Sequence, residues 1–437
     1  METFLIKAIQ LLLSLSILVA VHEFGHFIFA RIFKVRVEKF YLFFDPWFSL
    51  FKYKPKNSDT EYGIGWLPLG GYCKISGMID ESMDKEQLAK PAEPYEFRAK
   101  PAGQRLMIMI AGVVFNFILA LFIYSMILFT WGDSYIPLKK MNMGMYYSET
   151  AKQIGFQDGD QLVAADGVAQ DRFNPEVFAK AAEVTVNRNG ESIRIAMPED
   201  FIQRMMRDKK GFAGLRYPMI VEGVSEDMAA AKAGIQANDS IISINGKSTP
   251  TFEEVGELLA ENKGEAVEVG FVRAGVAQSL SVTTDSLGRI GVFVRSPAIL
   301  YGIAKTNYGF FESFPAGVTK GVNTLKGYVT DMKYVFTKEG AASLGGFGTI
   351  GGMFPSSFDW QTFWEKTAFL SIILAFMNIL PIPALDGGHV MFLLYEVIAR
   401  RKPSDKFMEY AQLTGMFLLF ALLLYANGND LFRYFFN

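Results

Sequence analysis

Two histidines and a glutamate occur together inside an apolar stretch near the start of the chain. Residues 21–30 read VHEFGHFIFA, so His26 follows His22 by four positions and Glu23 lies between them. On a helix this spacing puts both imidazoles on one face, where they can bind a single metal ion. A glutamate beside them can hold and deprotonate a water on that ion. The pattern predicts a zinc site with His22 and His26 as ligands and Glu23 as the general base.

The position of this motif in the chain strengthens the prediction. Residues 4–30 are otherwise apolar, and a crossing of the bilayer takes about 20 residues. An ionisable side chain inside a span costs about 2.5 kcal/mol or more, so such a residue is expected to have a function. The chain has three histidines, and two of them are in this motif.

A second group of polar residues interrupts an apolar segment near the end of the chain. A straight helix over residues 367–398 would be about 48 Å long, which exceeds a hydrocarbon core of about 30 Å. Pro381, Pro383 and the pair Gly387-Gly388 predict a break in this helix. Non-helical backbone at membrane depth is tolerated only beside protein or a water-filled cavity, so we expect a polar site here.

The break contains two candidates for a third zinc ligand. Asp386 and His389 both lie in the sequence NILPIPALDGGHV. Two imidazoles and one carboxylate leave the fourth position of a tetrahedral zinc open for water, which is typical of a catalytic site. We favour Asp386, and His389 is the competing ligand, with a role beside the site or at a helix start as its other explanation. One zinc ion per chain is expected.

Composition indicates a polytopic α-helical membrane protein. Half of the 437 residues are hydrophobic, and 40 residues are phenylalanine. The net charge of −2 gives no electrostatic reason to expect nucleic acid as a partner. The single cysteine excludes an internal disulfide and a cysteine-based metal cage. Four spans are expected, the third of them broken, at residues 4–30, 106–131, about 367–398 and about 411–424.

Basic residues near the ends of the spans predict the orientation of the protein. Residues 31–56 contain seven lysines and arginines against two acidic residues, and residues 400–406 contain four. By the positive-inside rule both loops face the cytoplasm. Both termini and residues 132–361 then lie on the exported side of a cell inner membrane, and the zinc site lies toward the cytoplasmic side.

The exported part contains an internal repeat. GFQDGDQLVAADG at residues 155–167 and GIQANDSIISING at residues 234–246 match at an offset of 79, and each precedes a helical stretch and a strand ending in Arg-x-Gly. The repeat predicts two tandem domains of one type. They resemble PDZ domains, which are α+β domains that bind extended peptides at a sheet edge. Folded spacers that limit access to the site are the alternative.

These features divide the chain into five parts. The part at residues 297–361 has scattered aromatics among polar residues and is expected to form amphipathic helices at the exported membrane surface, where they gate entry, or to pack against the PDZ pair. The other expected parts are two spans with a cytoplasmic loop at 1–131, PDZ-like domains at 132–210 and 211–296, and the last two spans at 362–437.

The loop between the first two spans is a candidate for substrate contact. Residues 65–77, GWLPLGGYCKISG, alternate apolar side chains around two glycines and predict a membrane-associated β-hairpin. A free hairpin edge at Gly70, Gly71 and Tyr72 can pair with an extended peptide. An ordinary cytoplasmic hairpin is the alternative. Asn116, an amide in an uncharged span, is expected to hydrogen-bond to a neighbouring helix or loop, as a structural residue or a substrate contact.

Taken in this order, the motifs resemble the site-2 protease family of intramembrane zinc metalloproteases, and within it the bacterial members with tandem PDZ domains. The resemblance covers nearly the whole chain and rests on HEFGH, DTEYGIGWLPLGGYCKISG, AGVVFNFILA, the PDZ pair, GGFGTIGG and NILPIPALDGG. It implies zinc on His22, His26 and Asp386, Glu23 as general base, and substrate or transition-state contacts from Asn378, Pro381 and Pro383. One departure is Gly346-Phe347, where the family has Gly-Pro.

The expected function is therefore hydrolysis of a peptide bond within or near the transmembrane helix of a single-span protein, such as an anti-sigma factor or a signal-peptide remnant. The bilayer and exported peptides bound by the PDZ domains are the other expected partners. Two other function classes stay open. A membrane-anchored PDZ receptor leaves HEFGH and LDGG without a role, and a zinc transporter needs more polar residues in its spans than Asn116 and Gln412.

Overall fold

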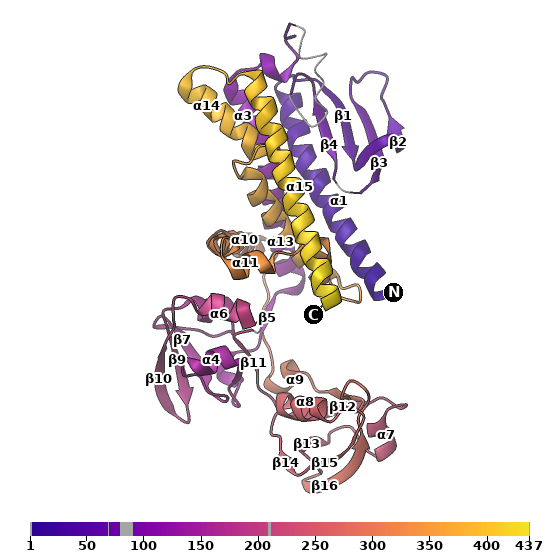
Figure 1. Cartoon of the computed structure of the whole chain (residues 1–437), viewed down its shortest axis with the longest axis vertical. Coiled ribbons are helices and arrows are strands. Elements are labelled where there is room, and N and C mark those ends of the chain that lie inside the picture. Colours follow the sequence, from indigo (N-terminus) through magenta and orange to yellow (C-terminus); the bar gives the residue numbers. More distant parts are fainter. Residues whose placement is uncertain (1, 69, 79–90, 209–210, 437) are drawn as a thin grey trace. The chain divides into compact units, whose positions relative to one another are not determined.

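The chain forms two compact units in the computed structural model, which describes residues 2–68, 70–78, 91–208 and 211–436. The first unit comprises Met1–Gly132 and Asn307–Asn437, and the second comprises Asp133–Thr306. The first unit consists mainly of helices with one four-stranded sheet (Figure 1). The second unit is built around two larger sheets with short helices.

Among the residues that the structure describes, three helices of the first unit are long and apolar enough to cross a membrane. They contain the first, second and fourth expected spans and are α1 (Glu2–Ile32), α3 (Ala102–Trp131) and α15 (Asp405–Phe436). Helix α15 extends beyond the expected residues 411–424 because its polar last turns have partners. Asp430, for example, accepts hydrogen bonds of 2.9 Å from the backbone N–H groups of Gly346 and Thr349.

The third expected span is broken, as the sequence predicts. Helix α13 (Trp360–Ile379) ends just before Pro381, and α14 (Asp386–Ala399) begins at the aspartate. The six residues between the two helices carry the backbone into the interior of the first unit, where Asp386 meets α1.

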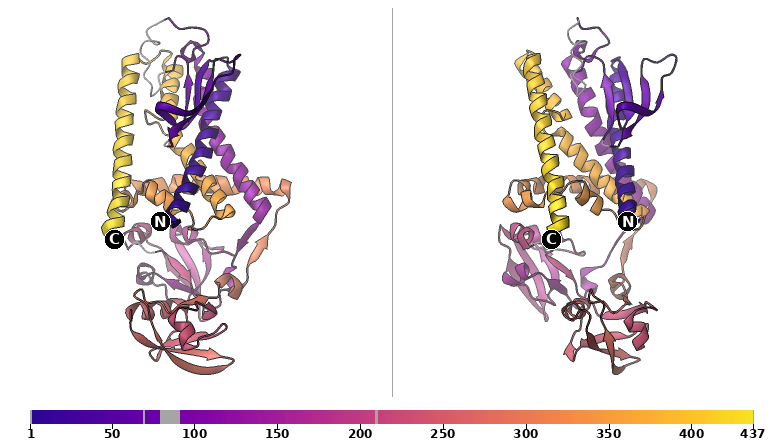
Figure 2. Two further views of the ribbon diagram at one scale, coloured as in Figure 1. Left: turned by 90° about the vertical axis from the view of Figure 1, so that its right-hand side faces the viewer. Right: turned by 45° about the vertical axis from the view of Figure 1, so that its right-hand side comes forward.

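Helix α3 is central to the first unit and packs against α1, α13, α14 and α10 (Phe310–Val335). Glycines allow the close approach of α10, because a Cβ on Gly317 would lie 2.5 Å from the backbone N of Ser125. Thus residues 310–335 of the expected amphipathic segment form one helix that packs on α3 and α13. Figure 2 shows it crossing the long helices. The short helices in the described part of this unit are η1 (Phe97–Ala99), α11 (Lys338–Ser343) and α12 (Phe347–Gly352).

The loop between α1 and α3 forms a sheet and not the predicted hairpin. Its strands are β1 (Val37–Leu42), β2 (Phe44–Tyr53), β3 (Glu61–Leu67) and β4 (Tyr72–Ile75), in the order β2-β3-β1-β4. The two strands expected to pair, β3 and β4, lie on opposite sides of β1, which is parallel to β3 and antiparallel to β4. The alternation of apolar residues identifies strands but not their partners, so the hairpin prediction was wrong. The expected free edge remains, because β4 is the outermost strand.

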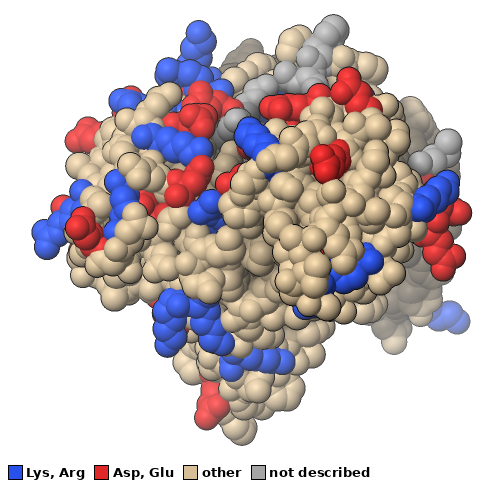
Figure 3. Space-filling model, turned by 90° about the horizontal axis from the view of Figure 1, so that it is seen from below, with Lys and Arg blue, Asp and Glu red and all other residues tan. Residues whose placement is uncertain are grey.

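The second unit contains one sheet around each copy of the sequence repeat. The first has the order β10-β9-β7-β8, and the second has the order β16-β15-β13-β12-β17, with β14 beside β13. Basic and acidic side chains are interspersed over much of the face in Figure 3, as on a solvated surface. The strands of the two sheets are β7 (Gln161–Ala165), β8 (Val168–Ala169), β9 (Glu183–Arg188), β10 (Glu191–Ala196), β12 (Met219–Val224), β13 (Ser240–Ile244), β14 (Lys247–Ser248), β15 (Ala266–Arg273), β16 (Val276–Thr283) and β17 (Val292–Val294).

Shorter elements flank and connect these sheets. Strand β6 (Met145–Tyr147) pairs with β11 (Ala213–Leu215), and β5 (Asp133–Tyr135) pairs with β18 (Ala304–Thr306), so both ends of the unit meet. The remaining helices are η2 (Leu138–Lys140), α4 (Glu149–Gln153), α5 (Pro175–Lys180), α6 (Phe201–Asp208), α7 (Ala229–Ala233), α8 (Phe252–Glu261) and α9 (Pro297–Tyr301).

The two copies of the repeat make the same hydrogen bonds. In the first, Arg188 holds both carboxylate oxygens of Asp160 at 2.7 Å. In the second, Arg273 holds Asp239 at 2.7 and 2.6 Å. Each arginine also donates to the backbone carbonyl of the glycine that opens its motif. The Arg-x-Gly at the end of each strand therefore has a structural reason: the arginine neutralises a buried aspartate at the start of the neighbouring strand.

Candidate active site

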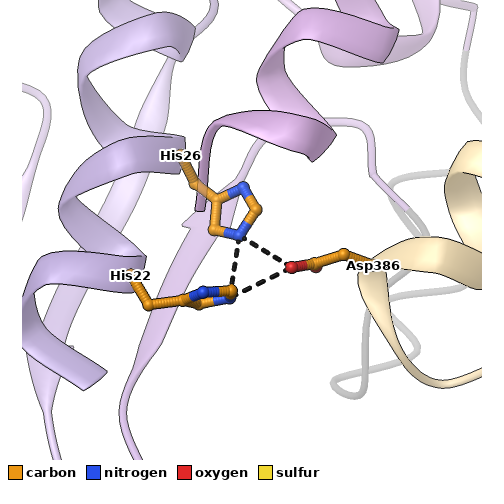
Figure 4. Close-up of side chains that lie close together, drawn as sticks. All are labelled: His22, His26 and Asp386. Atoms are coloured by element: carbon orange, nitrogen blue, oxygen red, sulfur yellow. Dashed lines mark hydrogen bonds and ion pairs between the residues drawn. The ribbon is translucent and has the colours of Figure 1, made fainter. Parts of the chain in front are cut away.

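The two histidines and Asp386 come together, although Asp386 is 360 residues away from His26 in the sequence. Nε2 of His22 lies 3.0 Å from Oδ2 of Asp386, and Nε2 of His26 lies 3.3 Å from the same oxygen. The two Nε2 atoms are 3.2 Å apart. Figure 4 shows the three groups pointing at one another from α1 and from the start of α14. Both imidazoles are buried, at 8% and 6% exposure.

The outer nitrogens of both imidazoles contact α3. Nδ1 of His26 lies 2.9 Å from the carbonyl oxygen of Ile108, so this nitrogen carries the proton and donates it. Nδ1 of His22 lies 3.3 Å from the side-chain amide of Asn116. Because Nδ1 of His26 is the donor, its Nε2 keeps a lone pair that faces Asp386. Metal-binding histidines in proteins are oriented in this way by a partner on the second nitrogen.

A close approach of α3 to α1 makes these contacts possible. A Cβ on Gly112 would lie 2.4 Å from Nε2 of His26 and 2.7 Å from Cε1 of His22, so no larger residue fits without displacing the imidazoles. On the other side, a Cβ on Gly25 would lie 2.6 Å from the carbonyl oxygen of Ala111. Two glycines that face each other therefore set the distance between the helices at the site.

The break before α14 places the carboxylate. Ala384 has φ of 77°, a left-handed conformation that is unusual for a residue with a side chain. The turn is so tight that a Cβ on Gly387 would lie 2.0 Å from the carbonyl oxygen of Leu380. A Cβ on Gly388 would lie 2.7 Å from the carbonyl oxygen of Ile382. The sequence LDGG thus needs both glycines to fold the break back on itself and to hold Asp386 against the histidines.

A cavity of about 430 Å³ opens onto this cluster. Its wall includes all three candidate ligands and Glu23, which places the expected base at the same cavity as the metal ligands. Strand β4 and the turn before it form another part of the wall. Of the expected substrate contacts, Gly71 and Tyr72 lie in this wall.

The remaining predicted residues lie at different distances from the cavity. The amide nitrogen of Asn378 is 3.5 Å from Nε2 of His22, so Asn378 is next to the cluster. Gly70 lies against the ring of Phe44. Pro381 and Pro383 instead line a separate groove against α15, where a Cβ on Gly415 would lie 1.9 Å from the carbonyl oxygen of Pro383. In the described residues the two prolines therefore shape the break and do not line the catalytic cavity.

Tyr72 is anchored by a network within the sheet. Its hydroxyl donates to Asp45 at 2.8 Å, and its ring stacks on Tyr41 with centroids 5.3 Å apart. Burial, and after it the hydrogen bond to the aspartate, raises the pKa of Tyr72, so the hydroxyl stays protonated. Tyr41 in turn donates to Glu61 at 2.7 Å. These contacts fix the edge strand beside the cavity.

Three polar residues of the cavity wall were not among the predicted site residues: Lys39, Lys74 and Gln412. Lys39 was counted only as a basic residue of the cytoplasmic loop 31–56, and Lys74 stood in the predicted hairpin at residues 65–77 without a role. The position of Gln412 in the fourth span was likewise noted without a role. His389 lines the catalytic cavity and also a neighbouring cavity of about 320 Å³. It is not part of the ligand cluster, which among the described residues consists of His22, His26 and Asp386.

The three clustered groups fit a zinc ion. Their ligand atoms lie within 4.8 Å of one another and are of the types that zinc binds in catalytic sites. Oδ2 of Asp386 is buried and accepts no hydrogen bond of good geometry from the described residues, although both histidines are close. A buried carboxylate oxygen facing two imidazole nitrogens is costly without a cation, and a metal ion removes that cost.

Comparisons with known proteins give the family of the chain. The model of peptidase family M50 matches residues 10–422 of the chain. The regulator of sigma-E protease RseP of Escherichia coli is 28% identical over 99% of this chain and 100% of its own length. RseP of Salmonella typhimurium is 29% identical over 97% of each chain. A Vibrio cholerae protein named "Putative zinc metalloprotease" is 28% identical over 97% of this chain and 98% of its own.

Proposed function

The chain belongs to peptidase family M50, and on this premise we propose that it cuts single-span membrane proteins within or near their transmembrane helices. Members of this family are zinc metalloproteases of regulated intramembrane proteolysis, and this chain is one of them. The observation that carries the proposal for the site is the convergence of His22, His26 and Asp386 within 4.8 Å, in a cavity that also contains Glu23.

The metal ligands, Glu23 and Asn378 have separate tasks in the proposed mechanism. When bound to the histidines and the aspartate, zinc lowers the pKa of a water toward about 7 and polarises the scissile carbonyl. Glu23 takes the proton of the attacking water and later delivers it to the leaving amine. Asn378, beside His22, is positioned to donate a hydrogen bond to the carbonyl oxygen of the substrate as negative charge develops there.

The edge of the sheet supplies a place for the unwound substrate. Strand β4 is outermost in its sheet and lines the catalytic cavity, so an extended peptide added to it would lie beside the ligand cluster. Backbone hydrogen bonds to such a strand depend little on side chains. This arrangement suits substrates of varied sequence whose helices can be locally unwound.

We also propose that the protein has four spans in a cell inner membrane, with the second unit exported and the catalytic cavity toward the cytoplasm. The basic loops at residues 31–56 and 400–406 support this orientation. The two sheets of the second unit are then PDZ-like domains, a proposal supported by their shared aspartate–arginine bonds. Exported domains of this kind would act as a filter that excludes substrates with a bulky exported part.

The filter is tested by deleting residues 146–294 and comparing an untrimmed with a pre-trimmed single-span substrate. We expect the variant to cut both, whereas the full chain cuts mainly the trimmed one. Loss of both activities in a variant that still inserts and binds zinc would show that the domains are needed for catalysis, and the filter would be rejected.

The catalytic assignment is tested with Glu23→Gln, which keeps the side-chain shape and removes the base. We expect about one zinc per chain, measured by metal analysis, and a fall in cleavage of roughly 10²-fold to 10⁴-fold. Glu2→Gln, at the exposed start of the same helix, is the control. Full activity in Glu23→Gln would eliminate the proposed mechanism. A receptor without catalysis predicts no zinc in either protein, and a transporter predicts zinc passage without cleavage.

A further inference from the structure

Two lysines lie side by side in the wall of the catalytic cavity. Lys39 on β1 and Lys74 on β4 are register partners in the antiparallel β1–β4 pair, and both line the cavity that contains the ligand cluster. Neither has a task in the mechanism above. Both side chains extend from the same face of the sheet, because directly opposite residues of an antiparallel pair share a face.

The charges of the two lysines are balanced to different degrees. Nζ of Lys74 lies 3.3 Å from a carboxylate oxygen of Glu38. The ammonium of Lys39 lies over the ring of Tyr41, 5.4 Å from its centroid, and makes no ion pair with a described residue. Its neighbour on β3, Glu61, accepts the hydroxyl of Tyr41 instead. Like charges directly opposite on two strands are destabilising, and the charge of Lys39 has no described ion-pair partner, so an anion beside the two ammonium groups would be favourable.

The place of these lysines relative to the free edge decides what they can contact. A strand added to β4 would put every second side chain on the face of Lys74, with Cβ atoms about 5 Å apart. Lys39 is one strand further away, about 10 Å from the added strand, which the four-carbon stem of a lysine can span. A carboxylate on that face of the substrate would therefore meet both ammonium groups.

We propose that Lys39 and Lys74 form a subsite for an acidic side chain of the substrate. This side chain would belong to the extended substrate segment on β4, close to the scissile bond. The subsite rests on the proposed function, because it requires an extended peptide on β4. It selects aspartate or glutamate at one position of the unwound segment and fixes the register of that segment, which backbone pairing alone leaves free to slip by two residues.

A peptide carboxylate fits this position better than the phosphate of a lipid. The lysines share their cavity with Glu23, His22 and Asp386 and stand next to an edge strand that can pair with peptide backbone. An acidic side chain is delivered there by the same strand that carries the scissile bond. A lipid headgroup remains a distinct outcome of the experiment.

The experiment measures kcat/KM of the full-length protein on a cleavable single-span model substrate in zwitterionic detergent. One aspartate is moved residue by residue along the segment around the cut, with asparagine at the same positions for comparison. In the wild type we expect kcat/KM for the aspartate substrate to exceed that for the asparagine substrate at one position by about fivefold to tenfold, the range expected of a partly exposed charged hydrogen bond.

Variants of Lys39 test whether this lysine causes the preference. Lys39→Gln should reduce the preference, and Lys39→Glu should reverse it in favour of a substrate lysine. Lys52→Gln, an exposed lysine of β2 in the same sheet, is the control and should leave the preference unchanged.

The outcomes separate this inference from the proposed function. Absence of any cleavage by the wild type would reject the proposed function itself. Cleavage with no preference for aspartate at any position, or an equal effect of Lys39→Glu on aspartate, asparagine and lysine substrates, would reject the subsite alone. An effect that appears only when anionic phospholipid is added, and that ignores the substrate's charge, would assign the lysines to a lipid headgroup and would also overturn the proposal.

Discussion

Asp386 and Asp239 are both buried aspartates, and their surroundings differ in a way that separates a ligand from a structural charge. The side chain of Asp239 is fully buried, and Arg273 holds both of its oxygens while the backbone N–H of Gln236 donates a third bond at 2.8 Å. Asp386 faces the imidazoles of His22 and His26, and its Oδ2 accepts no well-formed hydrogen bond from the described residues.

The difference teaches how to read a buried carboxylate. When the chain itself supplies a cation and donors, the carboxylate holds the fold together, as in the two sheets of the second unit. When the chain supplies other metal ligands instead, the charge is balanced only by a bound cation. The predictions below test this contrast, beginning with the largest effect.

Removal of the ligand should abolish the chemistry and leave the fold intact. In Asp386→Ala we expect loss of stoichiometric zinc and of cleavage, because two imidazoles alone bind the metal weakly. His389→Ala, one turn later on the same helix, should keep most of both, since His389 is outside the ligand cluster. Metal analysis and cleavage assays of the two variants provide the measurement. The opposite pattern would show that His389 is the ligand.

Removal of the structural aspartate should affect stability and not zinc. Asp239→Asn loses the charged bonds to Arg273, and we expect a local loss of about 2 kcal/mol. Hydrogen exchange of the amides of β13 and β15 in the full chain measures this loss, and the zinc content should not change. Asp160→Asn should act equally on β7 and β9. Asp200→Asn, on an exposed pair with Arg204, is the matched control and should change exchange little. Equal exchange in all three variants would contradict the contrast.

The sequence predicted the chemistry of the site better than the sheet beside it. His22 and His26 are four residues apart on one helix, so helical periodicity alone fixes their shared face. Asp386 could be predicted as a ligand because prolines and glycines mark a break in the helix. A break at membrane depth needs polar partners for its backbone, so a polar site was expected there. The β3–β4 hairpin was wrong because both strands pair with β1, 22 residues before β3 and 31 to 38 residues before β4, and alternation carries no information about that pairing.

The same limit explains the residues that the sequence did not reveal. Lys39 and Lys74 become neighbours only through the register of β1 and β4, so they looked like ordinary loop lysines. The contact of Asn116 with His22 depends on the approach of α3 at Gly112, which no local pattern shows. The aspartate–arginine pairs were partly visible in the sequence, because both residues recur in the two copies of the repeat. The sequence did not show that they bond to each other.

The orientation of His22 gives a smaller and more specific test. Nδ1 of His22 has the Asn116 amide as its partner, so Asn116→Ala should weaken zinc binding by roughly 10-fold to 100-fold while the three ligands remain. Competition with a chelator measures the affinity, and Asn116→Gln tests whether another amide restores it. Ser371→Ala is the control, because Ser371 bonds only the backbone of Asn116. An unchanged zinc affinity in Asn116→Ala would mean that His22 is oriented without this amide.

The smallest effect concerns the acid sensitivity of the structural pair. Burial alone would raise the pKa of Asp239, but the hydrogen bonds from Arg273 and the Gln236 N–H outweigh it and lower the pKa. A carboxylate with a lowered pKa in the folded state contributes stability above its unfolded pKa of about 3.9, and this stability is lost as the pH falls through the folded value. The amides of β13 and β15 should therefore lose protection below about pH 4 in the wild type.

In Asp239→Asn this part of the pH dependence should be missing, because the amide does not titrate. The measurement is hydrogen exchange of both proteins between pH 3 and pH 6, after correction for the intrinsic exchange rate at each pH. Other carboxylates with lowered pKa values, such as Asp285, titrate in both proteins and cancel in the difference. A wild-type protein whose protection falls in parallel with that of the variant would show that Arg273 does not stabilise the charged form of Asp239, and the contrast with Asp386 would then rest on geometry alone.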